Sequence, residues 1–129
     1  MSKKHAQLSW QNDTVPISDK FEDSYYSLED GLHEANYVFI DGNSLQKRLS
    51  HGFQIAELGF GTGLNFLATC AAWNKASKTG KFNFVSFEGY PISNSDLRKA
   101  HLLFPELSEY AEMLQTRWDE IIEGNLVDF

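Results

Sequence analysis

The sequence is poor in three features: cysteine, basic residues and long apolar runs. It holds one cysteine, Cys70, among 129 residues. A single thiol cannot form an intrachain disulfide, which excludes the cross-linked scaffolds of small secreted proteins. No apolar run approaches the length of a membrane span, and the first residues lack the apolar core of a signal peptide. These absences predict a cytoplasmic protein without a membrane partner.

The shortage of basic residues argues against independent nucleic-acid binding. Eleven Lys and Arg face 18 Asp and Glu, for a formal net charge of −7. Binding to a polyanion needs basic side chains that displace phosphate counterions. The acids gather in residues 19–34 and 105–129. His33 and His51 are isolated, with no Cys or carboxylate at ligand spacing, so we expect no metal site.

The remaining composition predicts one folded domain. Hydrophobic residues make up 42% of the chain, and ten of them are Phe. A chain of this length can bury one modest core. We expect residues 1–20 to form a loosely ordered lead and residues 21–129 to form the domain. Cys70 falls on the apolar face of an expected helix, so we interpret it as a packing residue.

Three glycines at alternate positions form the most informative stretch of the chain. Gly59, Gly61 and Gly63 follow a short apolar run and precede a segment with helical periodicity. This order indicates a strand, a tight turn and a helix start. Glycine there lets the backbone turn sharply and lets a ligand approach closely. Unpaired N–H groups at the start of the helix suit polar or anionic ligand atoms.

The glycine spacing of this loop, and the residues after its last glycine, distinguish it from other glycine-rich loops. A phosphate loop would have Lys and then Ser or Thr after its last glycine, whereas this chain has Leu64 and Asn65. A dinucleotide fingerprint is spaced G-x-G-x-x-G. The pattern from Glu57 to Gly63, E-x-G-x-G-x-G, instead resembles the first motif of class I S-adenosylmethionine-dependent methyltransferases. The resemblance implies a Rossmann-like parallel sheet in an α/β fold.

A second acidic residue stands where this resemblance places the ribose ligand. Residues 81–88 are predicted to form a strand, which places Glu88 about 25 residues beyond the loop. By the resemblance, Glu88 would hold the ribose hydroxyls. A glycine-rich βα turn without a ligand remains the alternative interpretation.

The other elements are expected from periodicity and turn signals. A helix should run from Leu64 to about Ser77, a second should open at Ser93, and a third should run from Glu106 to about Trp118. Tyr37–Ile40 is rich in β-formers, and Asp41-Gly42 is a strong hairpin signal. We therefore expect an N-terminal β-hairpin extension, with its return strand at residues 44–49.

Further motifs narrow the resemblance to one family. The motifs that support this resemblance are F-x-D-x-Y-Y-S at residues 21–27, D-G-L-x-E-x-x-Y-V-F at 30–39, E-x-G-F-G-T-G-L-N-F-L at 57–67 and F-P-E-L at 104–107. Together they resemble the methyltransferase domain of the tRNA 5-methylaminomethyl-2-thiouridine biosynthesis bifunctional protein, over about residues 10–118. The resemblance implies methyl transfer from S-adenosylmethionine to the amine of 5-aminomethyl-uridine at the tRNA wobble position. It also implies a flavin-dependent oxidoreductase domain, fused or separate, and tRNA as the substrate.

The resemblance assigns cofactor-binding residues but no catalytic residue. Glu57 would orient the loop or meet the methionine amino group through water. Tyr25 and Tyr26 would either line a ligand pocket or pack as core aromatics. The expected cofactor-binding set is Glu57, Gly59, Gly61, Gly63, Asn65, Glu88 and Tyr26.

The chain also departs from the family pattern. The family's domain is about twice as long and continues with strands that carry an Asp-Gly-Phe-x-Pro type motif at the acceptor site. Residues 119–129 do not supply it. We therefore expect an incomplete sheet and no methylation of tRNA by this chain alone. The alternative is a catalytically silent binding or interaction fragment.

Overall fold

The computed structural model describes residues 5–13, 15–25 and 31–129 of the chain. Its centre is a parallel pair of strands, β4 (Gln54–Leu58) and β5 (Asn83–Phe87), joined through helix α3 (Leu64–Lys75). The register places Ile55 opposite Phe84 and Glu57 opposite Ser86. The fold is therefore α/β with a small parallel sheet, as the sequence predicts.

One face of this sheet is covered and the other is open. Ile55 packs with Ala68 of α3, and the Phe66 ring meets the Phe84 ring at 5.3 Å. Side chains alternate between the faces of a strand, so the next residues point the other way. Leu58 and Phe87 on that open face are 88% and 64% exposed. The sheet thus has a helical layer on one side among the described residues.

Three helical elements complete the covered side. They are α4 (Asn94–His101), the 3-10 helix η2 (Pro105–Leu107) and α5 (Ser108–Ile122). The Ser93 hydroxyl caps α4 by accepting from the Asp96 N–H at 3.2 Å. Trp118 is buried in α5; its ring stacks on Phe60 at 5.4 Å, and its indole N–H donates to the Ile92 carbonyl at 2.8 Å. These contacts join α5 to the glycine loop and to the segment after β5.

The expected hairpin at residues 37–49 is wrong. The chain there forms a π-helix η1 (Ala35–Asp41) and α2 (Leu45–Arg48), and α1 (Gly31–Glu34) precedes them. A type I′ hairpin turn needs positive φ at both central residues, but Gly42 has a φ of −59°. A Cβ at Gly42 would lie 2.4 Å from the Val38 carbonyl oxygen, so glycine serves close backbone packing there. Ala35 and Ile40, five residues apart, provide the buried face of η1.

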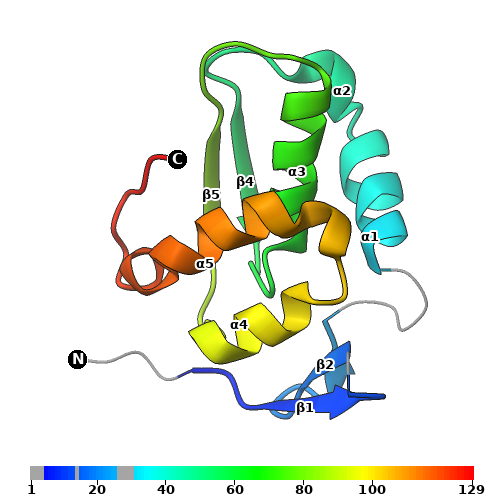
Figure 1. Cartoon of the computed structure of the whole chain (residues 1–129), viewed down its shortest axis with the longest axis vertical. Helices are drawn as coiled ribbons and strands as arrows, with labels where there is room; N and C mark the ends of the chain where they lie inside the picture. The colour runs from blue at the N-terminus through cyan, green and yellow to red at the C-terminus, as the bar shows by residue number, and fades with distance from the viewer. Residues whose placement is uncertain (1–4, 14, 26–30) are drawn as a thin grey trace.

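The N-terminal residues are more ordered than expected. Strands β1 (Leu8–Gln11), β2 (Val15–Ser18) and β3 (Asp23–Ser24) form an antiparallel sheet across the expected boundary at residue 20. Asn12 and Asp13 turn the chain between β1 and β2 with positive φ, which these two residue types tolerate. In Figure 1, α4 lies between these strands and α5.

Specific contacts hold this N-terminal sheet on the body. The Ala6 N–H donates to the Pro91 carbonyl at 3.0 Å. The Lys99 ammonium lies 3.1 Å from Asp13 and 4.4 Å from the centre of the Trp10 ring. The sheet therefore packs beside the carboxyl ends of β4 and β5.

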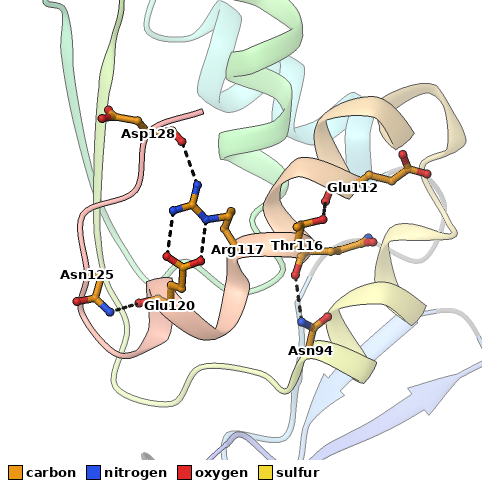
Figure 2. Close-up of polar contacts among 8 residues, drawn as sticks. Asn94, Glu112, Thr116, Arg117, Glu120, Asn125 and Asp128 are labelled. Carbon is orange, nitrogen blue, oxygen red and sulfur yellow. Dashed lines mark hydrogen bonds and ion pairs between the residues drawn. The ribbon is translucent and has the colours of Figure 1, made fainter.

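The C-terminal segment folds back beside β5 (Figure 1). Figure 2 shows Arg117 in a two-point contact with Glu120, at 2.8 and 2.9 Å, and reaching the Asp128 carbonyl at 3.4 Å. Asn125 donates to the Glu120 carbonyl at 3.2 Å. The Phe129 ring lies 5.9 Å from the Phe66 ring.

Among the described residues, no helix is long and apolar enough to cross a membrane.

Candidate ligand site at the glycine loop

The glycine loop connects the carboxyl end of β4 to the first turn of α3. Gly61 and Gly63 have φ values of +58° and +79°, a region that disfavours residues with a Cβ. A Cβ at Gly61 would lie 3.0 Å from the Tyr25 ring, and one at Gly63 would lie 2.7 Å from the Phe60 ring. The loop therefore requires glycine both for its backbone shape and for the space around it.

Glu88 lies against this loop, as expected for a residue at the end of the second strand. Its Oε1 accepts from the Gly61 N–H at 2.9 Å, and its Oε2 accepts from the Tyr90 N–H at 3.3 Å. The structure thus brings together two residues 27 positions apart that the motif pairs. A carboxylate has about four lone-pair positions, so Glu88 can accept further hydrogen bonds from a ligand.

Glu57 lies beneath the loop and is half-buried. Its Oε2 accepts from the Asn65 side-chain amide at 3.3 Å, whereas Oε1 is buried without a hydrogen-bond partner among the described residues. Burial raises the pKa of the Glu57 carboxyl; the Asn65 hydrogen bond opposes this shift, and the Glu88 charge adds to it. The Ser86 hydroxyl, on the residue opposite Glu57 in β5, also opposes the rise in pKa. It is not close enough or well enough aligned to form a hydrogen bond with Oε1. An unpartnered buried oxygen is costly and suits a donor supplied by a ligand or a water molecule.

Tyr25 closes the other side of the loop. Burial raises the pKa of its phenol, and the charges of Glu88 and Asp96 act in the same direction. The phenol therefore stays protonated near neutral pH and can donate a hydrogen bond. Tyr26, its partner in the sequence prediction, lies outside the described residues.

Two cavities meet at Tyr25 and Glu88. The smaller, about 400 Å³, runs over the glycine loop. The larger, about 940 Å³, lies between the N-terminal sheet and the segment after β5. Both fall in the usual size range of small-molecule sites.

The charge of the smaller cavity is one-sided. Its charged lining residues are Glu34 and Glu88, with no Lys or Arg among the described residues that line it. Such a lining favours a cationic ligand over an anionic one. Glu34 belongs to the motif at residues 30–39, but the sequence did not assign it to the ligand site. Among the described residues, no group of three or more His, Cys, Asp or Glu side chains is arranged to hold a metal.

A third cavity, about 630 Å³, lies between β5, α5 and the C-terminal segment. Aromatic and aliphatic side chains form most of its wall, including Phe60, Phe84 and Trp118. Glu88 is the charged residue that lines it among the described residues. Glu57 and Asn65, the other polar groups that the motif predicts, lie at the loop, so the loop is the stronger candidate site.

The fold and loop together define an α/β protein built around a strand, a glycine loop and a helix. No protein-family model matches the chain. It is 43% identical over 122 residues to the tRNA 5-methylaminomethyl-2-thiouridine biosynthesis bifunctional protein MnmC of Leptospira borgpetersenii, covering 91% of this chain and 19% of that protein. Identity to the protein of the same name from Aeromonas hydrophila is 44% over 131 residues, covering 95% of the chain and 20% of the relative.

These relatives confirm the resemblance drawn from the motifs. The Vibrio cholerae protein of the same name is 44% identical over 127 residues. The chain is thus homologous to a part of these bifunctional proteins and spans about a fifth of their length. A solved structure, MNMC2 from Aquifex aeolicus, shares the fold with a TM-score of 0.54 at 21% identity, over 81% of this chain and 38% of that one.

Proposed function

We propose that this chain is the S-adenosylmethionine-binding part of a tRNA-modifying methyltransferase. The reaction would transfer a methyl group to the amine of 5-aminomethyl-uridine at the wobble position. The relatives are named for the biosynthesis of tRNA 5-methylaminomethyl-2-thiouridine, whose 5-substituent is a methylated aminomethyl group. The proposal also draws on the class I motif from Glu57 to Gly63.

The contact between Glu88 and the Gly61 N–H carries the proposal. It fixes a carboxylate at the meeting point of the two cavities, with lone pairs left to accept from the two ribose hydroxyls of an adenosine. The main chain of the three loop glycines would face the methionine and ribose portions. Asn65, Glu57 and Tyr26 complete the proposed set.

The charge of the site suits this ligand. S-adenosylmethionine carries a sulfonium and an ammonium group, and the smaller cavity is lined by carboxylates. The buried Oε1 of Glu57 can accept from the ammonium group through water. The pyrophosphate of a dinucleotide would instead face Glu34 and Glu88. When bound, S-adenosylmethionine supplies an electrophilic methyl group on sulfur.

The partners belong to the same proposal. The relatives are bifunctional and about five times as long as this chain, so tRNA binding would be shared with other parts of the protein. A fused or separate flavin-dependent oxidoreductase domain would expose the amine that is methylated. The net charge of −7 agrees with a chain that does not recruit tRNA by itself.

Calorimetry tests the proposal with three ligands. S-adenosylmethionine should bind the chain more tightly than S-adenosylhomocysteine, which lacks the sulfonium charge, and NAD should not bind. Glu88→Ala should weaken S-adenosylmethionine binding roughly tenfold or more, the scale of a lost hydrogen bond to a charged group. Glu112→Ala, on the exposed side of α5, is the matched control and should leave affinity unchanged.

Equal binding by the parent chain and Glu88→Ala would contradict the assigned site. A folded chain that binds none of the three ligands would instead favour the alternative, a catalytically silent interaction fragment. Transfer of labelled methyl to tRNA bearing 5-aminomethyl-uridine, measured in the longer protein, tests the reaction itself.

A further inference from the structure

Three buried polar residues, one in the glycine loop and two behind it, have no part in the proposed ligand contacts. Thr62, His101 and Gln115 are 3%, 5% and 7% exposed. His101 ends α4 and its Nε2 lies 2.7 Å from the Thr62 carbonyl oxygen. Gln115 of α5 places its Nε2 2.8 Å from the His101 Nδ1. These hydrogen bonds thus link two helices to the middle of the loop through one imidazole.

Arg98 fixes the direction of these hydrogen bonds. Its guanidinium can only donate, and its Nη1 lies 3.3 Å from the Gln115 Oε1. The Gln115 NH2 group therefore faces His101 and donates to Nδ1. The ring proton must then be on Nε2, from which it is donated to the Thr62 carbonyl.

Asn94 holds this arrangement in place. Its Oδ1 accepts from the Arg98 Nε at 2.8 Å, and its Nδ2 donates to the Gln115 main-chain carbonyl at 3.0 Å. Each polar group thus has a partner of the opposite kind. A satisfied buried network of this sort is rigid and tolerates one protonation pattern.

The peptide that His101 holds lies between two loop glycines. The Thr62 carbonyl accepts from the ring, while the N–H of the same peptide, on Gly63, donates to the Phe60 carbonyl at 3.0 Å. The neighbouring Gly61 N–H donates to Glu88. Rotation of the Thr62–Gly63 peptide would break two hydrogen bonds and displace the third.

We propose that neutral His101 is a positioning residue for the ligand site, because its Nε2–H fixes the loop peptide that sets Gly61 against Glu88. This inference rests on the proposed function. Without the bond from His101, the glycine backbone would be free to leave the conformation that receives the ligand. His101 itself would not touch the ligand.

The protonation state of the ring gives this role a signature. Burial lowers the pKa of His101, and the bond to the Thr62 carbonyl partly opposes that shift. A protonated ring would direct a second N–H at the Gln115 NH2 group. Turning the Gln115 amide would relieve that clash but would oppose its NH2 to Arg98. The protonated ring therefore has no satisfied arrangement in this network.

Few charged groups act on the ring. From α4, Arg98 reaches Gln115, and Asp96 acts on Tyr25. The facing group of α5 is the neutral Gln115 amide, and the facing group of the loop is a carbonyl. Acidification should therefore loosen the loop when His101 takes up a proton.

The experiment compares the parent chain with His101→Leu, Gln115→Glu and the control His51→Gln. His51 is a second histidine, but it lies at the amino ends of the strands, where its Nδ1 accepts from the Lys81 N–H. Gln115→Glu provides a carboxylate that accepts from both Arg98 and a protonated ring, so the bond to Thr62 persists in acid. The readouts are hydrogen-exchange protection of the Gly61 and Gly63 amides without ligand, and S-adenosylmethionine affinity by calorimetry, each across a pH series.

In the parent chain and in His51→Gln, protection and affinity should both fall on acidification. In Gln115→Glu both should persist to lower pH. In His101→Leu both should be low and insensitive to pH, with affinity reduced roughly tenfold, the scale of one buried hydrogen bond.

Two results would overturn the positioning role. One is a folded His101→Leu chain with the loop protection and pH profile of the parent. The other is a Gln115→Glu chain whose loop protection and affinity fall on acidification as much as those of the parent. That result decides the question even if His101→Leu does not fold. A parent chain whose loop protection follows this pattern but which does not bind S-adenosylmethionine would contradict the proposed function and support the positioning role.

Discussion

Gly59 and Gly63 have nearly the same backbone conformation but different surroundings. Their φ values are +83° and +79°. A Cβ at Gly59 meets nothing within 4 Å, whereas one at Gly63 lies 2.7 Å from the Phe60 ring and 3.0 Å from Leu114. Gly59→Ala should cost about 1–2 kcal/mol from the backbone alone. Gly63→Ala should cost about 1–3 kcal/mol more, from overpacking.

Urea unfolding of the two variants measures this difference. Gly59→Ala is the matched control, since it carries the same strain without the clash. Equal losses of stability would show that Phe60 and Leu114 move aside at little cost.

The raised pKa of the Glu57 carboxyl leads us to expect a specific dependence of stability on pH. Burial raises the pKa of its carboxyl above the ordinary 4.5, so the folded chain binds this proton more tightly than the unfolded chain does. The resulting stability is fully present below the unfolded pKa and is lost as pH rises through the folded pKa. Glu57→Gln keeps an oxygen for Asn65 and removes the charge.

Glu57→Gln should therefore be more stable than the parent chain at neutral pH, and the two should converge as pH falls below 4.5. Urea unfolding at several pH values measures the difference. A variant less stable than the parent at neutral pH would show that the Glu57 charge is stabilised by its surroundings.

At this scale the sequence predicted the residues defined by a motif and missed those defined by packing. Glu88 was expected at the end of the second strand because a helix and a strand separate it from the loop by a known length, and it lies against Gly61. His101 was read as part of a helix, since nothing local shows that its ring reaches Thr62, 39 residues away. Such contacts arise only once α4 packs behind the loop.

Among the elements, periodic segments were predicted well and short ones were not. The helices α3 and α5 follow their apolar spacing, and β5 follows its alternation. The segment at residues 37–49 combined β-formers with Asp-Gly, yet tertiary packing made it helical. Leu45 and Leu49, four residues apart and both buried, are the helical signal that strand-like alternation concealed.

The missed hairpin at the N-terminus had a local signal as well. Leu8 and Trp10 are the half-buried residues of β1, and Asn12-Asp13 is a turn sequence. The segment is too polar to be recognised as strands from its hydrophobic pattern. It does not need a strongly apolar face, because this small sheet derives its stability from contacts with α4 and Pro91.

The cap of α4 makes a prediction at the scale of an element. Ser93→Ala removes the hydroxyl that accepts from the Asp96 N–H, so it should destabilise the chain by about 1 kcal/mol. Thermal unfolding measures this loss. Ser95→Ala, in the first turn of the same helix, removes a 3.2 Å contact with the Ser93 hydroxyl but keeps the bond from the Asp96 N–H, so it should change stability by less. An equal effect of the two substitutions would show that the cap contributes no more than ordinary helix propensity.

For the whole molecule, the open face of the sheet exposes a group of apolar side chains. Leu58, Val85 and Phe87 are 88%, 51% and 64% exposed. Parallel sheets in α/β proteins are normally covered on both faces. We therefore expect two copies of the chain to associate through this face, since contact between them removes apolar surface from water.

Sedimentation velocity over a range of concentrations tests this association. The double substitution Leu58→Lys with Phe87→Lys should shift the chain towards monomer. Leu102→Lys, at an isolated position that is 79% exposed, should not. A parent chain that remains monomeric at all concentrations would contradict the expectation.

The most direct test of the proposed function is a map of where S-adenosylmethionine binds. Amide NMR spectra of the chain, recorded during titration with the ligand, follow the loop glycines and glycines elsewhere in one experiment. The Gly59, Gly61 and Gly63 amides and the Asn65 side chain should shift together and saturate. Gly52, Gly80 and Gly124, which also have positive φ but lie outside the loop, should stay in place. Shifts centred on the Trp118 indole in the aromatic cavity, or no shifts at all, would contradict a ligand site at the glycine loop.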